Sequence, residues 1–150
     1  MTNQDRGRQL MVGVSTSDIQ ALISGSSDDA AKLLIEIANK LGAELKQLGF
    51  TTSQIRNVFG VVRSLDQRVR ADSAEQLADD VYRELLMLKP KLAYQKARAS
   101  TRDATSAADL LKQVFDTAID TIGRNRVYFE RFMDFFEAIL AYHRYHGGRN

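Results

Sequence analysis

The chain of 150 residues contains no cysteine. This excludes a disulfide framework, a thiolate nucleophile and any metal cluster held by cysteine. Long apolar runs are missing too, since none approaches the roughly 20 residues that a membrane-spanning helix needs. The first residues, Met1 to Asp5, lack the charged and then apolar pattern of a signal peptide. We therefore expect a cytoplasmic protein with no membrane partner.

Enzyme signatures are also missing. The sequence has no phosphate-binding loop, no dinucleotide-binding glycine motif and no paired-histidine metalloprotease motif. His143 and His146 lie three residues apart and could share a helix face, but a metal site would need a third ligand. A histidine near a helix C-terminus more simply complements the helix dipole. We predict a protein that is not an enzyme and has no metal or other cofactor.

Proline is rare, with a single residue at position 90, and no stretch alternates cleanly between apolar and polar residues. Apolar residues instead recur three and four apart, which is typical of amphipathic helices. We predict an all-α fold, an antiparallel bundle of five or six helices. Residues 1–25 are polar with scattered glycine and serine, so we expect a mobile N-terminal arm there and a single helical-bundle domain over residues 26–150.

Capping residues place the individual helices. Ser26 or Ser27 precedes the first, Thr51 to Ser53 begins the second, and Ser73 with Gln76 forms a capping box for the third. Pro90 is expected to break or kink the chain there. The remaining helices are predicted over residues 91–99, from 105 or 106 to 122, and over 126–145. The last has an apolar sector near half its circumference, which suits a central helix or one shared with another subunit.

A basic segment follows the third predicted helix. It contains no acidic residue, and Tyr94 lies among its cations, which are Lys89, Lys91, Lys96, Arg98 and Arg102. Cations interleaved with an aromatic ring can hold phosphates while the ring stacks on a base. The alternative is a solvated basic face with Tyr94 in the core.

A second group of cations is spaced along the second helix. Arg56, Arg63 and Arg70 recur every seven residues, so they form one stripe with a spacing of roughly 10 Å. Such a row could follow a phosphate backbone. Equally, arginine stems could merely cover the edge of the apolar face.

Two other functions fit parts of the sequence. The segment from Leu48 to Arg56 is similar to the turn and second helix of a helix-turn-helix, which would direct Ser53, Gln54 and Asn57 towards a DNA groove. The two flanking helices are longer than such a unit usually has. A helical scaffold protein without any nucleic-acid role is the other alternative.

Charge is also uneven along the third helix. Acidic residues gather over 72–84, before the basic segment that starts at Lys89. Copies of the chain could therefore stack head to tail through salt-sensitive contacts. The same pattern could instead balance charge within one bundle.

Three blocks of the sequence resemble the small-subunit family of the Csm-type (type III-A) CRISPR effector complex. They cover residues 52–59, 90–98 and 136–148, in the order and roughly the spacing of that family. The resemblance implies a small helical protein that does not cut RNA and binds guide RNA and target RNA beside other Csm subunits. It also implies several stacked copies within a filament.

The same resemblance supports some of the candidate RNA-binding residues more than others. Five of them fall within the matching blocks, namely Arg56, Lys91, Tyr94, Lys96 and Arg98. Arg63, Arg70 and Arg102 rest on spacing and charge alone. A subunit that serves any guide should contact phosphates and leave sequence recognition to base pairing.

Overall fold

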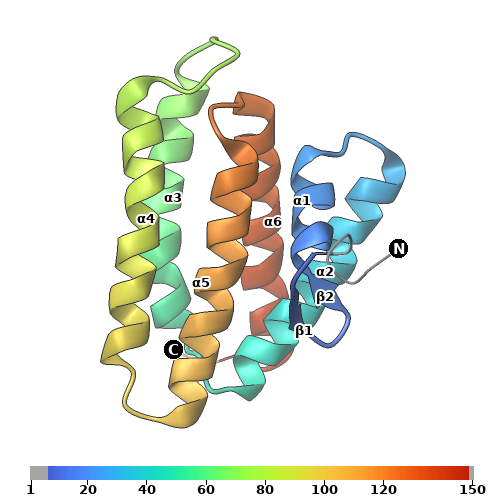
Figure 1. The fold of residues 1–150 in the computed structure, drawn as a ribbon, viewed down its shortest axis with the longest axis vertical. Coiled ribbons are helices and arrows are strands. Elements are labelled where there is room, and N and C mark those ends of the chain that lie inside the picture. Colours follow the sequence, from blue (N-terminus) through green and yellow to red (C-terminus); the bar gives the residue numbers. More distant parts are fainter. Residues whose placement is uncertain (1–6, 149–150) are drawn as a thin grey trace.

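The computed structural model describes residues 7–148 and confirms the predicted all-α bundle. Within that range, six helices follow a short hairpin (Figure 1). The hairpin strands are β1 (Gln9–Met11) and β2 (Val14–Ser15). The helices are α1 (Thr16–Ser24), α2 (Asp28–Gln47), α3 (Thr52–Arg70), α4 (Asp79–Arg98), α5 (Arg102–Ile122) and α6 (Arg126–Tyr145).

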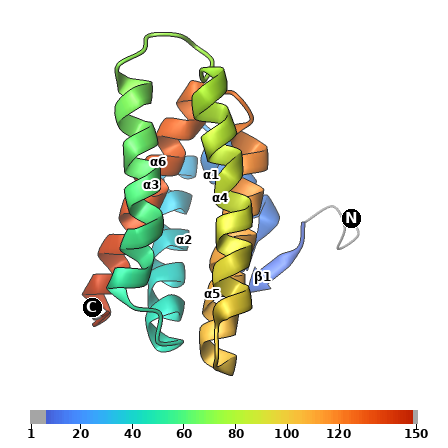
Figure 2. The same ribbon diagram turned by 90° about the vertical axis from the view of Figure 1, so that its left-hand side faces the viewer.

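Helices α5 and α6 occupy the middle of the molecule, with α3 and α4 on one side and α1 and α2 on the other (Figure 1). Helix α6 packs against both α2 and α3, while α5 packs against α1 and α4. From the side, α3 and α4 stand next to each other as an outer pair (Figure 2). Among the described residues, no helix combines the length and apolar character that a membrane span requires.

The central position of α6 explains its wide apolar sector. Phe132 and Phe136 both meet Phe115 of α5 edge to face, with ring centroids 5.1 and 5.0 Å apart. Phe136 also meets Phe59 of α3 at 5.3 Å. Edge-to-face pairs add stabilisation beyond the burial of apolar area. The aromatic residues of α6 thus join three helices in one core.

The N-terminal segment differs from the expected mobile arm. Helix α1 starts with a capping box between Ser15 and Asp18 and buries Ile19, Leu22 and Ile23 completely or nearly so. These residues belong to the same hydrophobic core as the later helices. The expectation of a mobile arm was wrong for residues 9–24. Helix α1 has nine residues and is too short to be stable alone, so packing against the core stabilises it. Residues 1–6 lie outside the described residues.

Three of the six predicted helix starts are confirmed. Ser27 caps α2, Thr51 and Gln54 form a capping box at α3, and Asn125 caps α6. Helix α5 begins at Arg102, earlier than expected, because Thr101 accepts the capping hydrogen bond from Ala104. Side-chain oxygens at these positions satisfy amide groups that have no partner within the helix.

Helix α4 corrects two predictions. It continues through Pro90 to Arg98 instead of breaking, because Leu85, Leu88 and Leu92 form one buried stripe across the proline. Pro90 lies on the exposed side, where water can solvate the carbonyl group that loses its partner. The capping box at Ser73 does not form, since residues 75–77 instead pair with the turn between α5 and α6.

The two histidines connect helices. His143 is fully buried, and its Nε2 lies 2.6 Å from the backbone oxygen of Phe50, which can only accept a hydrogen bond. His146 Nε2 lies 2.6 Å from Asn39 Oδ1 on α2. Their position near the C-terminus of α6 suggested a helix-dipole role, and the structure adds contacts between elements.

The crossing of α2 and α6 depends on Gly42. A Cβ atom at this position would lie 2.6 Å from the backbone nitrogen of His143. We predict that Gly42→Ala lowers the free energy of unfolding by about 1–3 kcal/mol, because the two backbones must move apart. Gly60→Ala is the matched control, since nothing lies within 4 Å of its added Cβ. That control should gain up to about 1 kcal/mol in helix propensity. Urea unfolding measures both, and equal effects would contradict this account.

Candidate nucleic-acid interface

The end of α4 and the start of α5 carry exposed cations without acidic partners. Lys91 and Arg98 lie on the exposed side of α4, and Arg102 begins α5. Within residues 7–148, no carboxylate oxygen lies within 4.0 Å of their charged nitrogens. We call these three residues and Tyr94 the α4 basic surface. Because α4 is continuous through Pro90, Lys91, Tyr94 and Arg98 are presented by one rigid helix.

Tyr94 is on the surface and not in the core. Its exposed fraction is 63%. The guanidinium carbon of Arg98 lies 5.6 Å from its ring centroid, which is within the range of a cation–π contact. The structure therefore excludes the alternative in which Tyr94 packs inside the bundle, and the ring is open to a stacking partner.

Lys96 has a different environment from its neighbours on α4. Its Nζ lies 2.7 Å from Asp109 Oδ1 on α5. Burial raises the pKa of Asp109, but hydrogen bonds from Lys96 and Gln113 outweigh that effect and hold it below the ordinary value. Lys89 similarly pairs with Asp120 at 2.5 Å. These two ion pairs connect α4 to α5. Lys89 and Lys96 are therefore not among the cations that lack an acidic partner.

The arginine stripe of α3 lies on a different face. Arg56 lines a hollow together with Glu137 and Arg144 of α6. Arg63 lies with its guanidinium carbon 5.6 Å from the ring centroid of Phe59, which itself meets α6. The stripe thus borders α6, whereas Arg68 faces α4 and pairs with Asp80 and Glu84. The two predicted groups of cations are not brought together.

The far end of the stripe is acidic. Arg70 Nε lies 2.9 Å from Oδ2 of the buried Asp66, and this hydrogen bond and charge raise the pKa of Arg70. Burial, with Asp66 and Glu130 nearby, raises the pKa of Asp134 in the same hollow. Arg70 is therefore engaged within the protein, and Arg56 and Arg63 are the members of the stripe that remain available.

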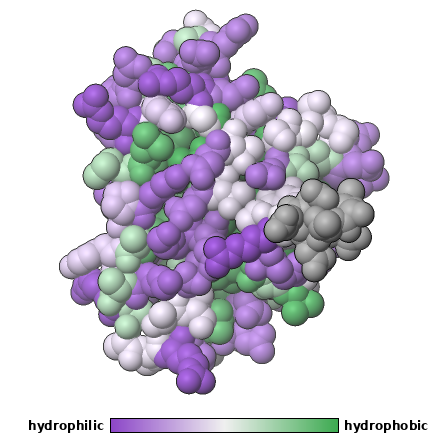
Figure 3. Space-filling model, in the orientation of Figure 1, coloured by the Kyte–Doolittle hydropathy of each residue, from purple (hydrophilic) through white to green (hydrophobic). Residues whose placement is uncertain are grey.

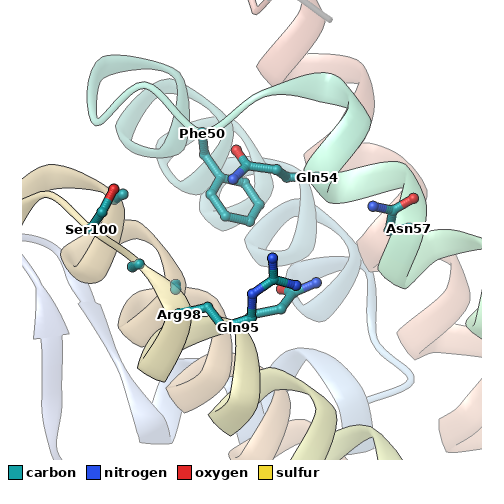
Figure 4. A pocket seen from close by; sticks show the side chains of 9 residues that line it. Phe50, Gln54, Asn57, Gln95, Arg98 and Ser100 are labelled. Atoms are coloured by element: carbon teal, nitrogen blue, oxygen red, sulfur yellow. The ribbon is translucent and has the colours of Figure 1, made fainter.

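A polar pocket lies next to the α4 basic surface, between α3, α4 and α5. It has a volume of about 320 Å³. Its labelled lining residues include Gln54 and Asn57 from α3 and Gln95 and Arg98 from α4 (Figure 4). The helix-turn-helix interpretation had singled out Gln54 and Asn57, but no sequence pattern indicated that Gln95 would face them.

The surface around α4 is mixed in character. Figure 3 shows mainly hydrophilic side chains over this side of the molecule, interrupted by small apolar patches. On α4, Met87 is an exposed apolar side chain, with an exposed fraction of 51%. Small, separate apolar areas of this kind are normal for protein surfaces.

The two aspartates with shifted pKa values should respond oppositely to neutralisation. Because the pKa of Asp109 is lowered in the fold, its charge stabilises the fold above the ordinary value of 3.8, and this contribution disappears as pH falls through the folded-state pKa. The pKa of Asp134 is raised in the fold, so its charged form opposes folding. The free energy of unfolding therefore falls as pH rises through the ordinary value of 3.8 and then the raised pKa. At neutral pH we expect Asp109→Asn to lower the free energy of unfolding by up to about 1 kcal/mol. Asp134→Asn should raise it. Urea unfolding at neutral and acidic pH tests both, and effects of the same sign would contradict the assignment.

Comparisons with known proteins identify the family. The family model described as Csm2 Type III-A matches residues 28–149. The CRISPR system Cms protein Csm2 of Streptococcus thermophilus is 28% identical over 101 residues, which cover 67% of this chain and 75% of that protein. The protein of the same name from Enterococcus italicus is 28% identical over 100 residues, covering 65% and 69% of the two chains. The chain therefore belongs to the Csm2 family and is a non-catalytic small subunit of the type III-A CRISPR effector complex, with other Csm subunits as partners.

Proposed function

We propose that this subunit binds the backbones of guide RNA and target RNA without sequence preference, chiefly through the α4 basic surface. The observation that carries the proposal is the set of three exposed cations without acidic partners, Lys91, Arg98 and Arg102, beside the exposed ring of Tyr94. Cations of this kind neutralise phosphates and release counterions, which favours binding whatever the base sequence. The ring can stack on any base, because every base has a π face.

The arginines of α3 provide a second and separate contact. Arg56 and Arg63 have no carboxylate within 4.0 Å among residues 7–148, whereas Arg70 is paired with Asp66. Lys96 and Arg70 keep some positive potential, but their carboxylate partners offset it. We therefore assign Lys96 and Arg70 lesser roles in RNA binding than their places in the two predicted groups of cations suggest.

A salt titration tests the α4 basic surface. The Lys91→Ala, Arg98→Ala, Arg102→Ala variant should bind single-stranded RNA more weakly, to a similar degree for unrelated sequences. The slope of log affinity against log salt should flatten by about 2, since each phosphate contact on a single strand contributes about 0.7. Lys32→Ala, Lys46→Ala on α2 is the control for general loss of exposed charge. A folded triple variant with unchanged affinity and slope would remove this surface from RNA binding.

Tyr94→Ala separates stacking from charge. Loss of a stacked ring should weaken RNA binding by about 1–3 kcal/mol and leave the salt slope unchanged. The melting temperature should hardly change, because the ring is exposed. Tyr145→Ala, which removes a ring that is 78% exposed on α6, serves as the control. An affinity equal to that of the wild type would show that Tyr94 does not stack on RNA.

The same binding assay distinguishes the two alternative functions. A helix-turn-helix regulator should prefer one double-stranded DNA sequence over RNA, and a scaffold protein should bind neither. Against the first alternative, Gln54 and Asn57 line the pocket that α4 and α5 border. Unlabelled DNA and RNA competitors added to the bound RNA measure the preference directly.

We also propose that copies of the subunit stack head to tail within the filament. The connection between α3 and α4, which contains Asp72 and Glu75, lies at the end of the molecule opposite the connection between α4 and α5 (Figure 2). Neither carboxylate has a cation within 4.0 Å in the described range. Asp79 and Asp80 are partly neutralised by arginines of the same chain. Contacts between the acidic end of one copy and the basic end of the next would satisfy both.

Light scattering on the RNA-bound protein measures this stacking. Assemblies should be larger at low salt and dissociate as salt increases, because exposed charges are screened beyond about 10 Å at 0.1 M ionic strength. Asp72→Asn, Glu75→Gln should shift the assemblies towards single copies. Single, unstacked copies of the wild type at low salt would refute the proposal.

A further inference from the structure

The proposed phosphate contacts use only Arg98 among the residues that line the polar pocket beside the α4 basic surface, and they leave the pocket itself without a ligand. Three carboxamide side chains line it, those of Gln54, Asn57 and Gln95, together with the guanidinium of Arg98 (Figure 4). Phe50 and two alanines of α5 supply apolar surface. None of the lining residues carries a carboxylate, and Arg98 is the one cation among them. This lining suits a neutral ligand with hydrogen-bonding edges and apolar faces.

The size of the pocket restricts the ligand further. A volume of about 320 Å³ is at the small end of the range for ligand pockets. It is too small for a helix or strand of another protein, but sufficient for one heterocyclic ring system. Unstacked bases of RNA are recognised in this way, by stacking on aromatic or guanidinium planes and by hydrogen bonds to their edges.

We infer that this pocket takes one unstacked nucleobase of the RNA strand that the α4 basic surface holds. The inference rests on the proposed function, which supplies the bound RNA strand, and it adds a binding site for one base of that strand. Arg98 connects the two sites, because it lines the pocket and also lies beside the ring of Tyr94. A nucleotide whose phosphate is near Arg98 therefore has its base next to the pocket.

The carboxamides provide the hydrogen bonds that a base edge needs. Oε1 of Gln95 is buried and has no partner within the described residues. Leaving a buried acceptor without a hydrogen bond is unfavourable, so this carboxamide gains a bond by turning its oxygen towards a donor that a ligand brings into the pocket. Gln54 uses Oε1 to accept from the backbone nitrogen of Thr51 at 2.8 Å, which leaves its NH₂ group for the pocket. Both donors and acceptors are thus available.

These groups do not require a particular base. A carboxamide carries a donor and an acceptor, and rotation about its last torsion exchanges their positions. Asn57 and Gln95 can therefore match different base edges by turning. The pocket is consistent with a subunit that serves guides of any sequence.

The test compares two single-stranded RNA probes of equal length, one with bases and one with an abasic ribose-phosphate backbone. Tyr94→Ala is the background, so that stacking on that ring does not contribute. The affinity for the probe with bases should be at least about 5-fold higher than the affinity for the abasic probe. Adding Asn57→Ala and Gln95→Ala should abolish most of this preference, while affinity for the abasic probe and the salt slope stay the same. Gln67→Ala, a carboxamide loss elsewhere on α3, should keep the preference.

A second measurement does not depend on phosphate contacts. Adenosine and uridine, added at millimolar concentration, should shift the side-chain amide NMR signals of Asn57 and Gln95. If the nucleosides shift these signals but neither RNA probe binds, the proposed function fails and the base pocket remains. If both probes bind and the preference survives the loss of both carboxamides, the base pocket is refuted whatever the nucleosides do. If neither RNA nor nucleoside binds, both proposals fail.

Discussion

The aromatic contact between α5 and α6 is the interaction on which the other helices depend. Phe115 meets two phenylalanines of α6, and one of these, Phe136, also receives Phe59 from α3. These rings fix the outer pair α3 and α4 relative to the centre, since α4 packs on α5 and α3 packs on α6. The relative position of α3 and α4 in turn defines the pocket between them, which lies beside the α4 basic surface. A change in the central aromatic core would therefore reach the surface.

A second constraint fixes the position of Phe50 in this pocket. The buried ring of His143 binds the carbonyl oxygen of Phe50, and Phe50 is one of the residues that line the pocket. The close approach of α2 and α6 at Gly42 sets the position of His143. The connection between α2 and α3 is thus tied to the end of α6 by a hydrogen bond in the interior, where such a bond is shielded from competing water.

Pairing with carboxylates decides which cations are free for the RNA contacts that we propose. Lys91 and Lys96 lie in the same basic segment of the sequence, yet Lys96 is held by Asp109 and Lys91 has no carboxylate within 4.0 Å in the described range. Arg63 and Arg70 differ in the same way, because Asp66 engages only Arg70. A cation that already has a partner must exchange it for a phosphate, so it contributes less to binding. The spacing of positive charges along the chain cannot reveal this difference.

The sequence by itself determined the helical class, the starts of α2, α3 and α6, and the family resemblance that the comparisons confirm. These features depend on local capping and on the period of apolar residues, which are visible within a short stretch of chain. Only the tertiary structure decided that α1 joins the core, that α4 runs through Pro90, and that the two groups of cations face different sides. Each of these depends on contacts between residues that are far apart in the chain. The stripe of leucines that continues α4 past Pro90 is stable because another helix covers it. The pocket exists because α3, α4 and the connection between α2 and α3 bring Asn57, Gln95 and Phe50 together.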